Sequence, residues 1–193
     1  MLFPAERFDN APVMSLQTGS ELARTARAVI NPHRLSVVAY ELEGRLLDQH
    51  PSLLRIADIR EIGPLGMIID SVDELIGLSD VISIKEIYEL AFELVGLRVI
   101  DERKRSVGRV VGYTVEAGNF VIQQIRVKRP LLKSLGDTEL LIHRSQIIKL
   151  TDDVIIVKTP TIRHKEPVAE SAGHAFDNPF RKSPQPSAES SDV

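Results

Sequence analysis

The stretch from Leu94 to Arg129 reads LVGLRVIDERKRSVGRVVGYTVEAGNFVIQQIRVKR, and it decides the fold class. Runs of Val and Ile between polar turns predict three strands, which cover residues 97–101, 107–116 and 120–129. Gly108 and Gly112 interrupt the second strand and predict a bend or a bulge. Ala117–Asn119 predicts a hairpin turn, because Gly and Asn tolerate positive φ. Short strands with glycine turns indicate a small barrel or sandwich.

The first half of the chain contains a second copy of this pattern. At a shift of 85 positions, INPHRLSVVAYELE (Ile30–Glu43) aligns with VEAGNFVIQQIRVK (Val115–Lys128). At a shift of 88 positions, LLRIADIREIGPLGMIID (Leu53–Asp70) aligns with LIHRSQIIKLTDDVIIVK (Leu141–Lys158). Two blocks in the same order at nearly the same shift indicate an internal repeat, and therefore two copies of one fold.

A helix and a polar tail complete the predicted organisation. Ser83 begins a capping-box pattern, which predicts a helix that starts at Ile84. Ile84, Ile87, Tyr88 and Ala91 are expected to share one face of that helix. After about Pro160 the chain is rich in Pro, Ser, Glu and Ala, a composition that predicts disorder.

Together these elements resemble the PRC-barrel domain family. Its members open with a strand that ends in Asp, a polar turn and a strand punctuated by glycines, as Leu94–Arg129 does. They close with a short strand, a helical turn and a hairpin around acidic residues, as ELLIHRSQIIKLTDDVIIVK (Glu139–Lys158) does. The first copy follows the same plan with Thr25 and Val29 near the positions of the two glycines, so a different bulge is expected there.

The resemblance covers about residues 13–158 and implies an all-β chain of two tandem small PRC-type β-barrels. The expected parts are a first barrel at 13–82, a connecting helix at 83–92, a second barrel at 93–160 and a disordered tail at 161–193. The family includes the cytoplasmic part of the photosynthetic reaction-centre H subunit and the C-terminal domain of a ribosome-maturation factor. These members imply protein-docking barrels that share no catalytic residues.

Composition and charge narrow the expected function. The chain has no cysteine, which excludes disulfides and fits a reducing cytoplasm. No stretch approaches the roughly 18 uninterrupted apolar residues of a membrane span, and a cytoplasmic location is expected. Residues 1–95 carry 8 basic and 15 acidic side chains, a net charge of −7, whereas residues 96–165 carry 14 and 7, a net charge of +7. Opposite charges favour docking of the two halves on each other, which would neutralise much of the basic surface.

The basic residues of the second copy are the main candidate for an interaction face. They are Arg103, Lys104, Arg105, Arg126, Lys128, Arg129 and Lys133. This face could bind an acidic protein partner or an RNA, or it could be an ordinary solvated surface. Few aromatic residues lie nearby, which disfavours single-stranded nucleic acid. The tail offers a second candidate, a short docking motif or an incidental apolar spot, formed by Phe176, Asn178, Pro179 and Phe180.

The sequence contains no arrangement that indicates catalysis. It lacks a nucleophile elbow, a phosphate-binding loop and the spacing of metal ligands. It therefore predicts a non-enzymatic protein-interaction scaffold or adaptor without cofactor or metal, with protein partners and with a homodimer as an open option. The alternative is a ribosome- or RNA-associated maturation factor that acts through the basic second barrel. A membrane-associated assembly factor is the third hypothesis.

Overall fold

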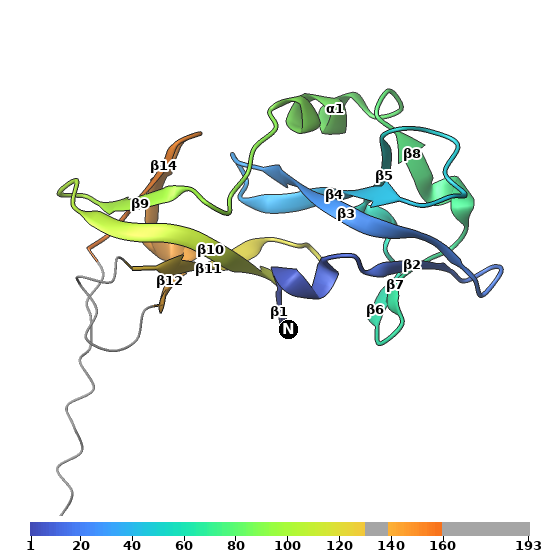
Figure 1. Ribbon diagram of the computed structural model, residues 1–193, viewed down its shortest axis with the longest axis horizontal. Helices are drawn as coiled ribbons and strands as arrows, with labels where there is room; N and C mark the ends of the chain where they lie inside the picture. The colour runs from blue at the N-terminus through green and yellow to red at the C-terminus, as the bar shows by residue number, and fades with distance from the viewer. Residues whose placement is uncertain (130–138, 160–193) are drawn as a thin grey trace, which may run out of the picture. The chain divides into compact units, whose positions relative to one another are not determined.

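The computed structural model describes residues 1–129 and 139–159. These residues form a mainly β structure with two sheets and one α-helix, as the sequence predicts (Figure 1). All of them belong to one compact unit. Among the described residues, each sheet is an open path of paired strands and does not close into a ring.

The first sheet has the strand order β6-β7-β2-β3-β4-β5-β8. Its strands are β2 (Pro12–Ser15), β3 (Glu21–Asn31), β4 (Ser36–Glu43), β5 (Ser52–Arg55), β6 (Glu61–Gly63), β7 (Gly66–Ile69) and β8 (Leu75–Gly77). The 3-10 turns η2 (Ile56–Asp58) and η3 (Val72–Glu74) connect strands of this sheet. β2 and β7 run parallel, and the other pairs are antiparallel.

The second sheet has the strand order β12-β11-β10-β9-β14-β13, with β1 paired to β10. Its strands are β1 (Leu2–Pro4), β9 (Arg98–Asp101), β10 (Ser106–Glu116), β11 (Ile122–Lys128), β12 (Glu139–His143), β13 (Ile147–Leu150) and β14 (Val154–Val157). The 3-10 turn η5 (Arg144–Gln146) connects β12 to β13. β9 and β14 run parallel, so the single parallel pair of each sheet joins equivalent strands.

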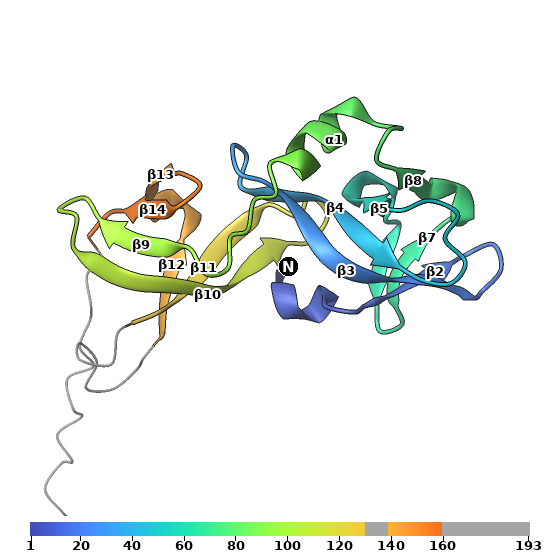
Figure 2. The ribbon, with the colours of Figure 1, turned by 45° about the horizontal axis from the view of Figure 1, so that its top comes forward.

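Six strands follow the same order in both sheets. The path β6-β7-β2-β3-β4-β5 of the first sheet corresponds to β13-β14-β9-β10-β11-β12 of the second (Figure 2). We call β2–β7 repeat 1 and β9–β14 repeat 2. Tyr40 and Ile125 are equivalent at a shift of 85 positions, and their partners Leu54 and Ile142 are equivalent at a shift of 88. The strand register therefore reproduces both shifts that the sequence predicts.

The central strands carry bulges at equivalent points. β3 changes register between Thr25 and Arg27, and β10 changes register between Val110 and Gly112, 85 positions later. Arg27 thus occupies the position of Gly112, where we expected Val29. At this point the expectation of a different bulge is wrong, because neither Arg27 nor Gly112 has a positive φ and the bulge does not require glycine.

The two repeats contact each other through equivalent residues next to their central hairpin turns. Ser36 and Val121, which are 85 positions apart, form an isolated antiparallel bridge. Two flanking backbone hydrogen bonds are also equivalent, from the N–H of Val37 to the carbonyl of Phe120 and from the N–H of Ile122 to the carbonyl of Leu35, each 3.0 Å long. Exchanging the repeats exchanges these two bonds, so the contact has pseudo-twofold symmetry.

Aromatic side chains fill the core at this contact. The ring of Phe8 lies 5.9 Å from that of Tyr40 and 5.2 Å from that of Phe120. These rings belong to one buried cluster that contains residues of both repeats. Arg144 of η5 adds a polar contact, since its guanidinium donates to the carbonyl of Leu35 at 3.1 Å. The two repeats are thus held together mainly by apolar burial.

The N-terminal segment joins repeat 2, although the expected first barrel begins only at residue 13. β1 pairs antiparallel with β10, and the N–H of Ala117 donates to the carbonyl of Met1 at 2.8 Å. The 3-10 turn η1 (Ala5–Phe8) then places Phe8 in the core with 2% of its surface exposed. A strand of three residues is too short to show a periodic pattern, so sequence alone does not identify its distant partner strand.

The predicted helix is present as α1 (Ile82–Glu89). Ile84 packs in a separate apolar cluster with Val29, Ala39 and Leu53 of repeat 1. The predicted capping box is wrong, since Val81 is the N-cap and no side chain caps the helix. Ser83 lies inside the first turn. The expected packing of Ala91 is also wrong, because the residue lies beyond the helix and is exposed.

Candidate docking surface

Three basic side chains lie side by side on neighbouring strands of repeat 2. Arg98 of β9 is the register partner of Arg109 of β10, and Arg109 is the partner of Lys128 of β11. All three residues are exposed. Neighbouring strands are about 4.8 Å apart, so like charges opposite each other repel and lower stability. We call Arg98, Arg109 and Lys128 the basic row.

One carboxylate lies beside the basic row within the part of the chain that the structure describes, because Glu139 of β12 is the register partner of Lys128. Arg98, Arg109 and Lys128 form no ion pair there. The guanidinium of Arg109 donates to the carbonyl of Gly96 at 3.0 Å, which orients the charge without cancelling it. Adjacent cations that outnumber the neighbouring carboxylate favour binding of an anionic group.

A groove of about 700 Å³ lies along the basic row. Its lining combines the row and Arg129 with the apolar residues Val95 and Val111. Ligand sites typically have volumes of roughly 300–1,000 Å³. The aliphatic stems of Arg and Lys add further apolar surface beneath their charged ends. The groove therefore offers apolar contact and positive charge to the same ligand.

Gly108 lets β10 approach β11 closely at this groove. A Cβ atom at this position would lie 2.2 Å from the carbonyl oxygen of Lys128, which is far inside van der Waals contact. The equivalent residue of repeat 1 is Ala23. Ala23 is the register partner of Val13, and Gly108 is the register partner of Val99. The close approach thus belongs to repeat 2 alone.

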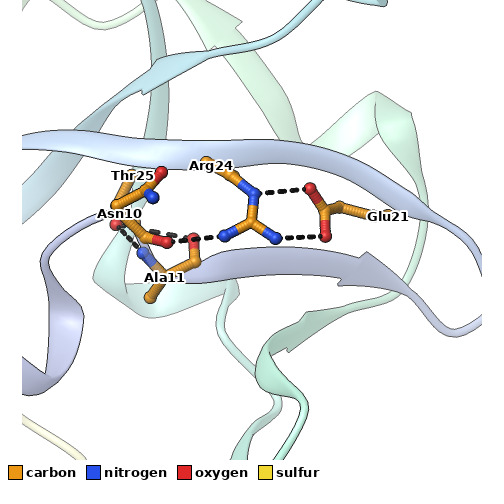
Figure 3. Close-up of polar contacts among 5 residues, drawn as sticks. All are labelled: Asn10, Ala11, Glu21, Arg24 and Thr25. Carbon is orange, nitrogen blue, oxygen red and sulfur yellow. Dashed lines mark hydrogen bonds and ion pairs between the residues drawn. The ribbon is translucent and has the colours of Figure 1, made fainter.

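The equivalent row of repeat 1 is neutralised. Its register partners are Pro12, Arg24 and Glu43. Figure 3 shows both carboxylate oxygens of Glu21 accepting hydrogen bonds from the guanidinium of Arg24, at 2.8 and 2.9 Å. The carbonyl of Asn10 accepts a third, at 2.9 Å. Repeat 1 thus has one cation in an ion pair where repeat 2 has three cations that form no ion pair among the described residues.

The predicted candidates Arg103, Lys104 and Arg105 lie in the β9–β10 turn. The buried carboxylate of Asp101 organises this turn by accepting from the N–H of Arg103 at 2.9 Å and of Arg105 at 2.8 Å. The Arg105 side chain also donates to it, at 2.7 Å. Burial alone would raise the pKa of Asp101, but the hydrogen bonds and charge of Arg105 hold it below its ordinary value. Arg105 therefore has a structural partner, and Ser15 caps the equivalent turn of repeat 1.

The remaining predicted candidates divide into three groups. Lys128 and Arg129 line the groove. Arg126 forms an ion pair with Glu6 of η1, the only ion pair between the acidic first half and the basic second half in the described ranges. Among the described candidates, only Arg126 therefore shows the predicted neutralisation by the acidic first half. Lys133 and the tail motif of Phe176, Asn178, Pro179 and Phe180 lie outside the described residues.

Sequence reasoning missed Arg98 and Arg109. Each stands alone in its strand between apolar residues, so neither belongs to a run of charges in the sequence. The signal that identifies them is cross-strand register, which places Arg109 between Arg98 and Lys128. Register follows from the repeat and its bulges, and could be found from sequence only after the strands were paired.

Every aromatic side chain among the described residues is buried or half-buried. Within the described ranges, the surface around the basic row therefore lacks the stacking platform that single-stranded nucleic acids use. No helix among the described residues is long and apolar enough to cross a membrane. No protein-family model matches the chain, and no curated protein matches its sequence.

Proposed function

We propose that the chain is a non-enzymatic protein-interaction scaffold built from two PRC-type barrels, and that repeat 2 docks an acidic segment of a partner protein. The observation that carries the proposal is the basic row with its apolar groove. Three aligned cations that form no ion pair among the described residues lower the stability of the sheet. An acidic partner that covers the row would remove this repulsion on binding.

Chain geometry supports the barrel part of the proposal. β12 and β13 are the two edges of the repeat 2 path, yet only the three residues of η5 separate them. Four residue steps span at most about 14 Å, whereas six flat strands extend over about 24 Å. The sheet therefore has to curl until its edges approach each other, which is the plan of a small barrel.

The groove favours an acidic protein segment over RNA. Its valines offer apolar contact, which alternating acidic and aliphatic side chains satisfy and a phosphate backbone does not. The lack of an exposed aromatic side chain among the described residues also weighs against single-stranded RNA. RNA binding through the basic row is the second outcome that the experiment distinguishes.

Fluorescence anisotropy of the full chain with two labelled probes tests the proposal. One probe is a peptide of alternating Glu and Leu, and the other is a single-stranded RNA of equal charge. We expect the peptide to bind more tightly than the RNA. Arg109→Gln is expected to weaken peptide binding roughly 3- to 10-fold, because it removes the central charge of the row.

Arg24→Gln is the matched control, since Arg24 is the equivalent residue in repeat 1 and is already paired with Glu21. It is expected to leave peptide affinity unchanged within about twofold. Equal loss in both variants, or no peptide binding by the full chain, contradicts the proposal. Tighter binding of the RNA, with a steep dependence on salt, would instead support the maturation-factor alternative.

A further inference from the structure

The outer edge of repeat 2 differs from its counterpart in repeat 1. In repeat 1, β8 pairs with β5 on the side away from β4, and Leu53 in β5 is fully buried. In repeat 2, the equivalent strand β12 pairs only with β11 among the described residues. Leu141, the equivalent of Leu53 at a shift of 88, leaves 60% of its surface exposed. An edge that carries an exposed leucine is a template for another strand.

Hydrogen-bond alternation directs the backbone of Leu141 toward this free edge. Peptide groups of an antiparallel strand point alternately to one neighbour and to the other. The N–H of His143, two residues further on, donates to the side chain of Gln146 at 2.9 Å and not to β11. Residues of the same parity, including Leu141 and Glu139, therefore present their N–H and C=O groups to the edge.

The equivalent strand of repeat 1 has the same parity. In the β5–β8 ladder, the N–H of Gly77 donates to the carboxylate of Asp80 at 2.6 Å. Gly77 and its register partner Ser52 are therefore a non-hydrogen-bonded pair. The next pair, Leu53 with Ile76, then exchanges the backbone bonds. β8 thus shows that an added strand fits at this point of the fold.

The residue order of β12 is self-complementary. The strand reads Glu139-Leu140-Leu141-Ile142-His143, with an acid at one end, a base at the other and apolar residues between them. Antiparallel pairing of two such strands about Leu141 sets leucine against leucine and Glu139 against His143. We propose that two copies of the chain dimerise through antiparallel β12 strands centred on Leu141.

The imidazole of His143 is oriented for this contact. The N–H of Ser145 donates to its Nδ1 at 3.2 Å, so the ring proton lies on Nε2. Nε2–H remains available to donate to the carboxylate of Glu139 from the second copy. Each dimer contains this pair twice, because the interface is isologous.

The interface is small and the dimer is expected to be weak. Strands of five residues bury less than the roughly 1,000 Å² of a stable interface, so we expect a dissociation constant of about 1–100 μM. Sedimentation velocity of the full chain across that range is expected to show a reversible shift from monomer to dimer. Leu141→Lys is expected to weaken the dimer at least about tenfold, because it places two like charges on the symmetry axis.

Leu46→Lys is the matched control, since Leu46 lies in the β4–β5 loop with 63% of its surface exposed. It is expected to leave dimerisation unchanged. A chain that remains monomeric across the whole range overturns the proposal. So does a dimer that Leu141→Lys and Leu46→Lys weaken equally.

A cysteine cross-link tests the symmetry axis directly, since the chain contains no cysteine of its own. Opposite residues of a hydrogen-bonded antiparallel pair have Cα atoms about 5.5 Å apart, which lies within the range that a disulfide spans. Leu141→Cys is therefore expected to form a covalent dimer rapidly under mild oxidation, and Leu46→Cys is expected to form it slowly. Equal rates for the two variants contradict the proposed axis.

Charge exchange tests the antiparallel register. Glu139→Lys and His143→Asp are each expected to weaken the dimer, and the double variant is expected to recover it. Asp retains an oxygen that can cap η5, so the turn itself is preserved. Failure of the double variant to recover dimerisation excludes this register. Glu139 is the register partner of Lys128 in the basic row, so the dimer and the proposed docking function are separated with Leu141→Lys, which changes no residue of the row.

Discussion

Repeat 1 and repeat 2 share an order of six strands, but they differ in what covers their outer faces. In repeat 1, α1 and β8 pack over Val29, Ala39 and Leu53. The equivalent residues of repeat 2 are Thr114, Gln124 and Leu141, of which none is buried. The same backbone plan thus uses its outer face for internal packing in one copy and exposes it in the other.

The cross-strand charges differ in the same way. Repeat 1 holds Arg24 in an ion pair with Glu21. Repeat 2 aligns Arg98, Arg109 and Lys128, which form no ion pair among the described residues. The proposed function therefore assigns stability mainly to repeat 1 and binding mainly to repeat 2. Exchanging equivalent residues between the copies tests this division of roles.

The largest expected difference concerns the two equivalent leucines. Leu53→Ala is expected to lower the free energy of unfolding by about 2–5 kcal/mol, because it leaves a cavity in a fully buried site. Leu141→Ala is expected to change it by less than about 0.5 kcal/mol, because the side chain is exposed. Urea denaturation at a concentration that keeps the chain monomeric measures both. Equal losses would show that the two edges are covered alike.

The two turn caps give the next difference. Ser15→Ala is expected to lower the free energy of unfolding by about 1 kcal/mol, because it removes one acceptor for the N–H of Thr18. Asp101→Ala is expected to cost more, because its carboxylate holds two backbone N–H groups and the guanidinium of Arg105. The same denaturation experiment compares them. A smaller loss for Asp101→Ala would remove the assigned role of the carboxylate.

The carboxylate of Asp101, which caps the turn of repeat 2, also predicts that the free energy of unfolding depends on pH. The pKa of Asp101 in the folded chain lies below its ordinary value of 3.8. Its contribution to stability is therefore complete above that value and is lost as the pH falls through the lower, folded pKa. Asp101→Asn is expected to flatten the loss of stability below about pH 4. Denaturation midpoints of both proteins between pH 7 and pH 3 measure the difference, and parallel curves would contradict it.

The smallest expected effect concerns the basic row. Lys128→Glu installs the residue type that repeat 1 has in Glu43, opposite Arg109. Combined with Glu139→Gln, which removes the carboxylate opposite position 128 on β12, it is expected to raise the free energy of unfolding by about 0.2–1 kcal/mol while it weakens binding of the acidic peptide. Glu43→Lys is the reverse exchange and is expected to lower stability by a similar amount. Urea denaturation at low salt is the measurement, with Glu139→Gln alone as the reference, and a loss of stability in the double variant would show that the row is not under repulsion.

Local pattern was sufficient to predict the repeated β elements. Alternating apolar residues and glycine turns identified β9, β10 and β11, and the two shifts identified their partners in repeat 1. The pattern misplaced the cap of α1, because Ser83 matches a capping box in sequence while Val81 occupies the cap. A capping motif reports a preference worth about 1 kcal/mol, and packing of Ile84 against the sheet can override it.

The sequence by itself determined the β character, the repeat and the charge difference between the halves. These properties depend on residues near each other in the chain or on totals. The tertiary structure decided that β1 joins β10, that Arg109 stands between Arg98 and Lys128, and that Leu141 is exposed where Leu53 is buried. The physical reason is that strands far apart in sequence determine the register of a strand and what covers its side chains. The sequence of a single strand does not specify these partners.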